Sequence, residues 1–299
     1  MLNTFLDVIV PVIAIAAVGG VVGRRIGLDL DTLSKIIFYL FTPALVFTGL
    51  SSIELEGGAI ARLTACSIGV FVVNAAIALV WARLRGLEAA KRASVAISSA
   101  VPNQGNMGLP MARLAFGTVG LEFGTVLFAV GIILNASAAV ALGAMALGEH
   151  TPGRALLAPL RYPSIYAAAA GVIVNMMNVD LPVAIEEPIA TLADASIPCM
   201  LVVLGLSFHL PKPGDLEHPI AVSINRLVLG PLAAVGLASL VGLEGIAHDV
   251  TILMAGMPAA VNTTILAGRL GADVPLAVRI VVVSTSLSIV TLTVLLTIL

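Results

Sequence analysis

The residues best suited to contact a solute lie in the segment 98–117, whose sequence is SSAVPNQGNMGLPMARLAFG. Two prolines and a glycine interrupt this otherwise helical stretch: Pro102, Gly105 and Pro110. Proline removes a backbone donor and glycine accepts unusual backbone angles, so the helix is expected to break here. The alternative is a proline kink whose free groups are satisfied by neighbouring helices. The amide side chains of the segment are Asn103, Gln104 and Asn106.

A second segment, MPAAVNTTIL at 257–266, repeats this spacing, because Pro258 and Asn262 lie four residues apart, as Pro102 and Asn106 do. A break here would place another half-helix N-terminus beside Asn262 and Thr263. Two such ends facing each other carry partial positive charge and free N–H groups, which favour an anion such as a carboxylate. The Asn, Gln and Thr side chains add neutral hydrogen bonds, so we assign both segments to a substrate site.

Ionisable residues inside apolar segments are the other functional candidates. Asp194 lies in the apolar segment 182–208, where an acid is costly and is expected to bind a coupling cation, Na⁺, or to carry H⁺. Its alternative role is structural, as a partner of an arginine or a cap of a broken turn; Arg226 and Arg279 lie near enough to span interiors to be considered. The chain has no HExxH motif and no spaced Cys/His set, so neither a metal site nor catalytic residues are predicted.

The composition determines which elements must position these residues. The chain has 299 residues, of which 59 % are hydrophobic and 11 % charged, and its mean hydropathy is +1.11. So little charge cannot cover a soluble enzyme, and the net charge of −2 gives no sign of nucleic-acid binding. A membrane helix needs about 20 mostly apolar residues. Ten segments meet this need: 4–23, 33–52, 60–82, 92–116, 121–147, 155–177, 182–208, 219–241, 247–269 and 274–297.

The basic residues predict the orientation of these ten spans. With the N-terminus outside, the external connections hold only Arg62 and Arg113. The cytoplasmic connections then hold Arg24, Arg25, Lys35, Arg83, Arg85, Lys91, Arg92, Arg154, Arg161, Lys212 and Arg269. This bias follows the positive-inside rule, and it predicts that both termini lie outside.

The two halves of the chain repeat the same pattern of proline, glycine and asparagine residues. The second span reads TPALVFTGLS and the seventh reads IPCMLVVLGLS, and the two proline–asparagine segments recur in the fourth and ninth spans. Motifs that recur five spans apart place the halves, 1–150 and 151–299, in opposite orientations, which is the inverted-repeat plan of secondary transporters. Chance recurrence of Pro, Gly and Asn in apolar helices is the alternative explanation.

Three segments resemble the auxin efflux carrier family, in the form that bacterial members take: PNQGNMGLPMARLAFG, MPAAVNTTILAGRLGAD and YPSIYAAAAGVIVN. The resemblance covers nearly the whole chain. It implies a ten-helix fold like that of bile-acid symporters and sodium/proton antiporters, with a scaffold part and a transport part. By the same resemblance, Pro102 with Asn103 and Pro258 with Asn262 match two unwound helices that cross at the substrate site.

The sequence and the resemblance together predict an all-α integral membrane protein, expected in a bacterial inner membrane. Its function is expected to be secondary transport of small organic anions, auxin- or malonate-like carboxylates, by elevator-type alternating access. A sodium-coupled bile-acid-type symporter is the nearest alternative, and a membrane receptor or an intramembrane enzyme is a more distant one. The expected partners are the organic anion and the lipid bilayer, with a homodimer as an expectation from the family, and no cofactor is predicted beyond a coupling ion.

Overall fold

The computed structural model describes residues 2, 5–53, 58–148, 158–208 and 214–299. Within these ranges the regular elements are helices, and the extended backbone pairs once, in an isolated antiparallel bridge between Pro102 and Ala259. Seven helices there are long and apolar enough to cross a membrane: Phe5–Arg25, Leu30–Ser51, Ala59–Leu84, Gln104–Leu147, Val183–Ser207, Glu217–Leu240 and Val274–Ile298. Two shorter apolar helices span Pro163–Met176 and Gly245–Ala255. The protein is therefore an all-helical integral membrane protein.

The longest of these stretches, Gln104–Leu147, is not one straight helix. Gly117 has φ 68° and ψ −153°, a combination outside the helical region that glycine adopts without a Cβ penalty. The chain consequently changes direction there, between the sequence-predicted spans 92–116 and 121–147. Arg154 and Lys212, which support the predicted orientation, lie outside the described residues, as do the start of the span 155–177 and the predicted boundary between the two halves.

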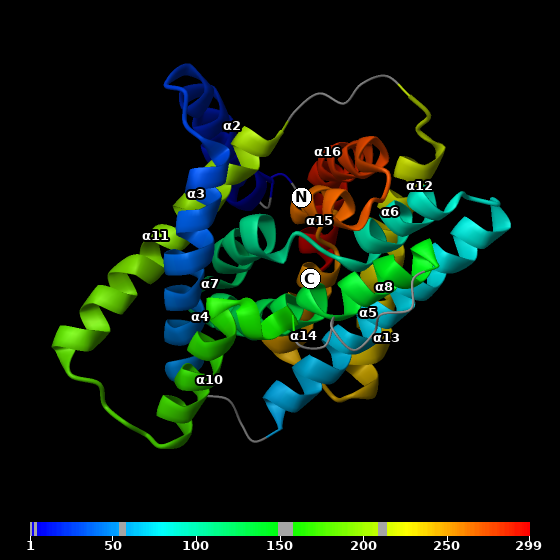
Figure 1. The fold of residues 1–299 in the computed structure, drawn as a ribbon. Coiled ribbons are helices and arrows are strands. Elements are labelled where there is room, and N and C mark those ends of the chain that lie inside the picture. The colour runs from blue at the N-terminus through cyan, green and yellow to red at the C-terminus, as the bar shows by residue number, and fades with distance from the viewer. Residues whose placement is uncertain (1, 3–4, 54–57, 149–157, 209–213) are drawn as a thin grey trace.

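The helices form two groups that lie side by side (Figure 1). The outer group contains η1 (Phe5–Ile9), α2 (Val10–Arg25), α3 (Leu30–Ile36), η2 (Ile37–Phe41), α4 (Thr42–Ser51), η4 (Ala158–Arg161), α10 (Pro163–Met176) and α11 (Val183–Ser207). The crossing group contains α5 (Ala59–Leu84), α6 (Ala89–Ala100), η3 (Gln104–Gly108), α7 (Leu109–Ala136), α8 (Ala138–Leu147), α12 (Glu217–Ile224), η5 (Asn225–Leu229), α13 (Gly230–Leu240), α14 (Gly245–Ala255), α15 (Asn262–Leu270) and α16 (Val274–Ile298). Helix α7 packs against both groups.

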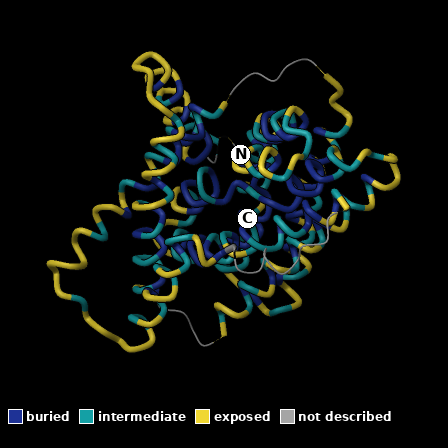
Figure 2. The backbone as a smooth tube through the Cα atoms, viewed as in Figure 1, coloured by how far each residue is buried: buried dark blue, intermediate teal, exposed yellow. Residues whose placement is uncertain are grey.

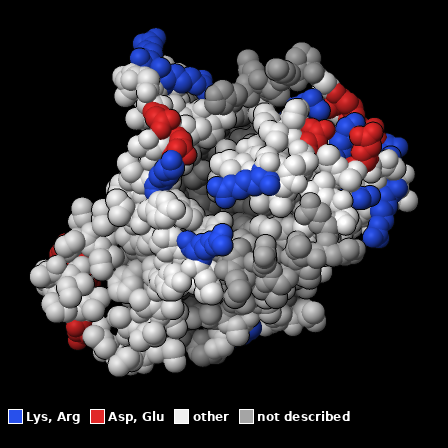
Figure 3. Space-filling model, in the orientation of Figure 1, with Lys and Arg blue, Asp and Glu red and all other residues white. Residues whose placement is uncertain are grey.

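Buried residues concentrate in the middle of the molecule, and α6, α7 and α14 each contribute several of them (Figure 2). By contrast, α11 and the turn before it are mostly exposed along their outer side. Figure 3 shows many of the charged side chains near the upper and right edges of this view, two groups of basic side chains near its middle and a few acidic ones at the lower left, with broad uncharged areas between them. An apolar exterior of this kind is what lipid contact requires, because lipid gives no hydrogen bonds to polar groups.

Glycines let α2 and α11 approach closely in the outer group. A Cβ on Gly20 would lie 2.7 Å from the carbonyl oxygen of Gly205, and a Cβ on Gly205 would overlap the carbonyl oxygen of Ala16. Small residues at such crossings allow backbone-to-backbone packing, which is a main source of helix association in membranes. Arg24 adds a polar contact, because its Nη2 donates to Gly205 O at 3.2 Å, near the C-terminal end of α11.

We predict that Gly205→Leu lowers the free energy of unfolding by about 1–3 kcal/mol or more, because its side chain would force α2 and α11 apart. The measurement is thermal melting of the purified protein in detergent. Gly236→Ala is the matched control, since Gly236 lies in α13 with no neighbouring atom within 4 Å of the added Cβ. Equal melting temperatures for Gly205→Leu and Gly236→Ala would contradict the close packing of α2 on α11.

Candidate functional site

Two interrupted helices cross at the centre of the crossing group. Helix α6 ends at Ala100 and the chain becomes extended at Val101 before the π-helical turn η3 begins at Gln104. Helix α14 ends at Ala255 and the helix resumes only at Asn262, the start of α15. Both interruptions therefore lie inside otherwise apolar helical stretches, which leaves several backbone groups without helical partners.

The two interruptions satisfy part of each other's backbone. Asn103 N donates to Pro258 O at 2.8 Å, and Ala260 N donates to Val101 O at 3.0 Å, so the two extended pieces pair in antiparallel fashion. Ala259 N donates to Ser284 Oγ of α16 at 3.2 Å. The crossing is thus bonded within itself and to a third helix, as buried backbone groups require.

Arg226 holds the C-terminal ends of both interrupted helices. It lies in η5, and its side chain is completely buried. Its Nη1 donates to Ser99 O at 3.1 Å, its Nη2 to Ala255 O at 2.9 Å, and its Nε and Nη2 to Met257 O at 3.2 and 3.1 Å. The last carbonyls of a helix carry partial negative charge, so a guanidinium is a favourable partner for them.

The charge of Arg226 has no carboxylate partner among the described residues, where ion pairs join Lys35 to Asp31, Arg85 to Glu217 and His248 to Asp249. A possible pairing of Arg226 with Asp194, left open by the sequence, is therefore absent. Arg279 does not pair with Asp194 either, and its guanidinium lies near Gly214. Within the described part of the chain, the crossing thus holds the buried positive charge of Arg226 without a carboxylate to balance it.

A small cavity of about 30 Å³ lies beside the crossing. Its lining includes Gln104, Asn135, Arg226 and Thr251. A water needs roughly 10–15 Å³ of such space, so the cavity suits about two water molecules and is too small for an organic anion. A solute of that size therefore requires the surrounding helices to move.

Buried amide and hydroxyl groups near the crossing have unsatisfied hydrogen-bonding capacity. Asn103 Nδ2 and Asn135 Oδ1 are buried without a partner among the described residues. The same holds for Asn74 Nδ2 and Oδ1, Asn225 Oδ1, Ser98 Oγ and Ser99 Oγ. Because buried polar atoms are nearly always paired, such a concentration points to water or a ligand at the site.

The sequence-predicted substrate residues fall into different environments. Asn103 and Gln104 are buried at the crossing, and Asn106 is half-buried in η3. Thr263 is buried, but its hydroxyl donates to Ala260 O at 2.7 Å. Asn262 is exposed at the start of α15 and does not line the cavity.

The predicted helix-breaking residues also differ in their surroundings. Pro102 and Pro258 lie in the two extended pieces, and both take part in the pairing there, Pro258 through its carbonyl oxygen. Gly105 lies in η3 against the ring of Phe128, and Pro110 lies in the first turn of α7, directly after η3.

Asp194 lies within α11 and is exposed, on the same side of the helix as Glu187 and Thr191. It forms no hydrogen bond or ion pair with a described residue. It belongs to the outer group, through its place in α11.

The sequence analysis missed most of the polar groups around the crossing, including Asn74, Asn135 and Asn225. The available signal was one amide within each of the predicted spans 60–82, 121–147 and 219–241. Arg226 carried a similar signal, as a basic residue near the middle of an apolar span.

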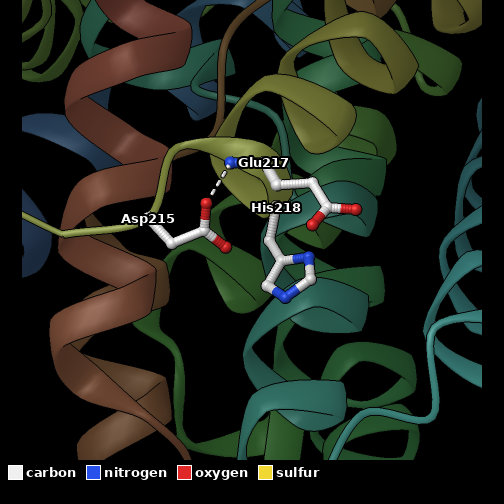
Figure 4. A group of neighbouring side chains, drawn as sticks. All are labelled: Asp215, Glu217 and His218. Carbon is white, nitrogen blue, oxygen red and sulfur yellow. Dashed lines mark hydrogen bonds between the residues drawn. The ribbon is translucent and has the colours of Figure 1, made fainter.

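A second polar cluster lies at the edge of the molecule, before and within the first turn of α12 (Figure 4). Asp215, Glu217 and His218 have ligand atoms within 4.8 Å of one another. Asp215 Oδ1 accepts from Glu217 N at 3.0 Å, and the carboxylate of Glu217 pairs with Arg85. The carboxylate of Asp215 thus forms part of the turn at the start of α12, and the carboxylate of Glu217 forms a surface ion pair.

We predict that Ser284→Ala lowers the free energy of unfolding by about 1–3 kcal/mol, because it leaves Ala259 N without an acceptor in a buried place. Ser288→Ala is the control: Ser288 is also buried on α16, but its hydroxyl donates to Thr285 O on its own helix and supports no backbone N–H of the crossing. Thermal melting compares the two variants. A Ser288→Ala variant as unstable as Ser284→Ala would contradict this role for Ser284.

Comparison with known proteins shows the family of this chain. The sequence profile of a family described as membrane transport protein matches residues 4–153 and again 150–296. An "Uncharacterized transporter" of Methanothermobacter thermautotrophicus is 30 % identical over 97 % of this chain and 95 % of its own length. A "Putative malonate transporter" of Rhizobium meliloti is 28 % identical over 87 % of this chain and 84 % of its own length. The crossed helices thus stand in a chain that belongs to the membrane transport protein family of auxin efflux carriers, and the protein is a membrane transporter.

Proposed function

We propose that this transporter moves small organic anions, and that their carboxylate binds at the crossing of the two interrupted helices. The observation that carries the proposal is the buried charge of Arg226, which lacks a carboxylate partner among the described residues. An anion would balance this charge at short range, where the low dielectric strengthens the attraction. The relative named as a malonate transporter supports the same class of substrate.

The hydrogen-bond donors for the anion come from the N-terminal ends of the helices that resume after the two breaks. Asn103 offers an unpartnered buried Nδ2, and Asn262 stands exposed at the start of α15, where a helix N-terminus favours negative charge. Gln104 and Asn106 lie next to Asn103 in η3, and Thr263 follows Asn262. We assign these five residues to the substrate site.

We propose elevator-type alternating access as the mechanism. The small cavity calls for movement before an organic anion fits, and the two helix groups provide a natural division between a moving and a static part. In this proposal the outer group is the scaffold and the crossing group moves with the bound anion. The chain would then cross a bacterial inner membrane ten times, as inverted halves 1–150 and 151–299 with both termini outside. A homodimer would form through the scaffold.

We predict that Asn103→Ala weakens carboxylate binding about 10- to 100-fold, because it removes a hydrogen bond to a charged group. The melting temperature without ligand should hardly change, since Asn103 Nδ2 has no partner to lose. The measurements are malonate uptake into proteoliposomes and the malonate-induced rise in melting temperature.

Asn262→Ala is expected to weaken binding in the same direction, because it removes a donor from the other interrupted helix. Asn178→Gly is the matched control: Asn178 is an exposed amide with φ 49° near the α10–α11 turn, far along the chain from both breaks. Wild-type uptake in both Asn103→Ala and Asn262→Ala would overturn the proposed site.

Asp194 is the carboxylate that we propose for proton coupling, because it lies exposed within α11 without a partner among the described residues. Asp194→Asn keeps the shape of the side chain and removes the carboxylate that would carry the proton, so it should flatten or shift the pH dependence of uptake. Thr191→Val, one turn earlier on the same face, is the control for lost polarity alone. An unchanged pH profile in Asp194→Asn would show that Asp194 takes no part in coupling.

A further inference from the structure

Arg226 binds the kind of groups that hold a coupling cation in other secondary transporters. In transporters with interrupted helices, unwound carbonyls and half-helix C-terminal ends coordinate the coupling ion. Here Ser99 O comes from the end of α6, Ala255 O from the end of α14, and Met257 O from the unwound piece that follows. The guanidinium contacts all three oxygens at 2.9–3.2 Å.

The contacts of Arg226 match the demands of a cation site and not those of an ion pair. Its acceptors are neutral backbone oxygens, and ion pairs among the described residues do not include it. Carbonyl oxygens can replace the hydration shell of a monovalent cation when they converge from several directions. Carbonyl oxygens of both interrupted helices converge on the guanidinium of Arg226. A free cation could therefore bind at this place only by displacing that guanidinium.

We propose that Arg226 is a tethered cation that takes the place of a coupling sodium ion between the two interrupted helices. The wild-type carrier accordingly binds no sodium there, which argues against sodium-coupled symport. This inference rests on the proposed carrier function, since a coupling ion has meaning only in a transporter. Because Arg226 is part of the chain, its positive charge stays at the site through every step of the transport cycle, whereas a sodium ion would enter and leave.

The neighbouring cavity makes the proposal testable by chemical rescue. Arg226 lines that cavity, so Arg226→Ala would join the vacated space to it and leave three carbonyl oxygens without donors. A small soluble cation can then enter the vacated position. We expect Arg226→Ala to lower the melting temperature by roughly 6 °C or more in choline chloride, because unsatisfied buried acceptors are costly.

The experiment measures melting of the full-length protein in detergent at constant ionic strength, in choline, sodium or methylguanidinium chloride. Methylguanidinium is expected to restore part of the lost melting temperature of Arg226→Ala, and sodium a smaller part. Arg62→Ala is the matched control, because Arg62 donates to a single backbone oxygen, Gly242 O, at 2.9 Å. Its melting temperature should not rise in either salt, which separates site-specific rescue from a general salt effect.

Charge and packing are distinguished by two further variants. Arg226→Lys keeps a cation and should melt above Arg226→Met, which has a long apolar side chain without donors. The proposal is overturned if Arg226→Lys and Arg226→Met have the same melting temperature. It is also overturned if neither cation raises the melting temperature of Arg226→Ala more than that of Arg62→Ala, or if sodium stabilises the wild-type protein in a saturable way. If Arg226→Ala fails to fold, the proposal is tested by the comparison of Arg226→Lys with Arg226→Met and by the sodium titration of the wild-type protein. None of these readouts uses a transported anion, so they stand independently of the carboxylate proposal.

Discussion

Helices that stop inside a membrane leave carbonyl and N–H groups where no water can satisfy them, and the fold around the crossing meets this constraint from within. The C-terminal carbonyls are taken by the guanidinium of Arg226, which is fully buried. The extended pieces pair with each other at Val101 and Ala260, and at Asn103 and Pro258. Because the pairing uses backbone groups of both interrupted helices, and Arg226 contacts carbonyls of both, neither helix can be broken stably without its partner.

This arrangement also determines the charge of the site. Satisfying the carbonyl ends with an arginine places a positive charge in the crossing, while the N-terminal ends of the resumed helices keep partial positive charge of their own. No described carboxylate neutralises them. The unpartnered Nδ2 of Asn103 adds a further donor. The positive charge of Arg226 and the donor of Asn103 favour an anion over a sugar or a cation at this site, which connects the fold of this membrane transporter to the carboxylate substrates we propose.

The sequence predicted the spans well where an apolar run alone decides them, as at 60–82 and 274–297, which correspond to the helices Ala59–Leu84 and Val274–Ile298. It could not predict the acceptors of Arg226, because they are backbone oxygens up to 127 positions away, and backbone groups leave no residue-specific pattern. Proline and glycine spacing indicated both interruptions, but it gave no information on burial. Asn103 and Asn262 occupy corresponding places in the two motifs, yet one is buried and the other exposed, since tertiary packing differs between the two halves.

The most direct measurement is an experimental structure of the protein determined in the presence of malonate. The account predicts density for a carboxylate at the crossing, within hydrogen-bond distance of Asn103 and of the first turn of α15, with Arg226 still on the carbonyls of Ser99, Ala255 and Met257. A malonate bound away from the crossing, or a carboxylate side chain from the chain itself neutralising Arg226, would contradict it.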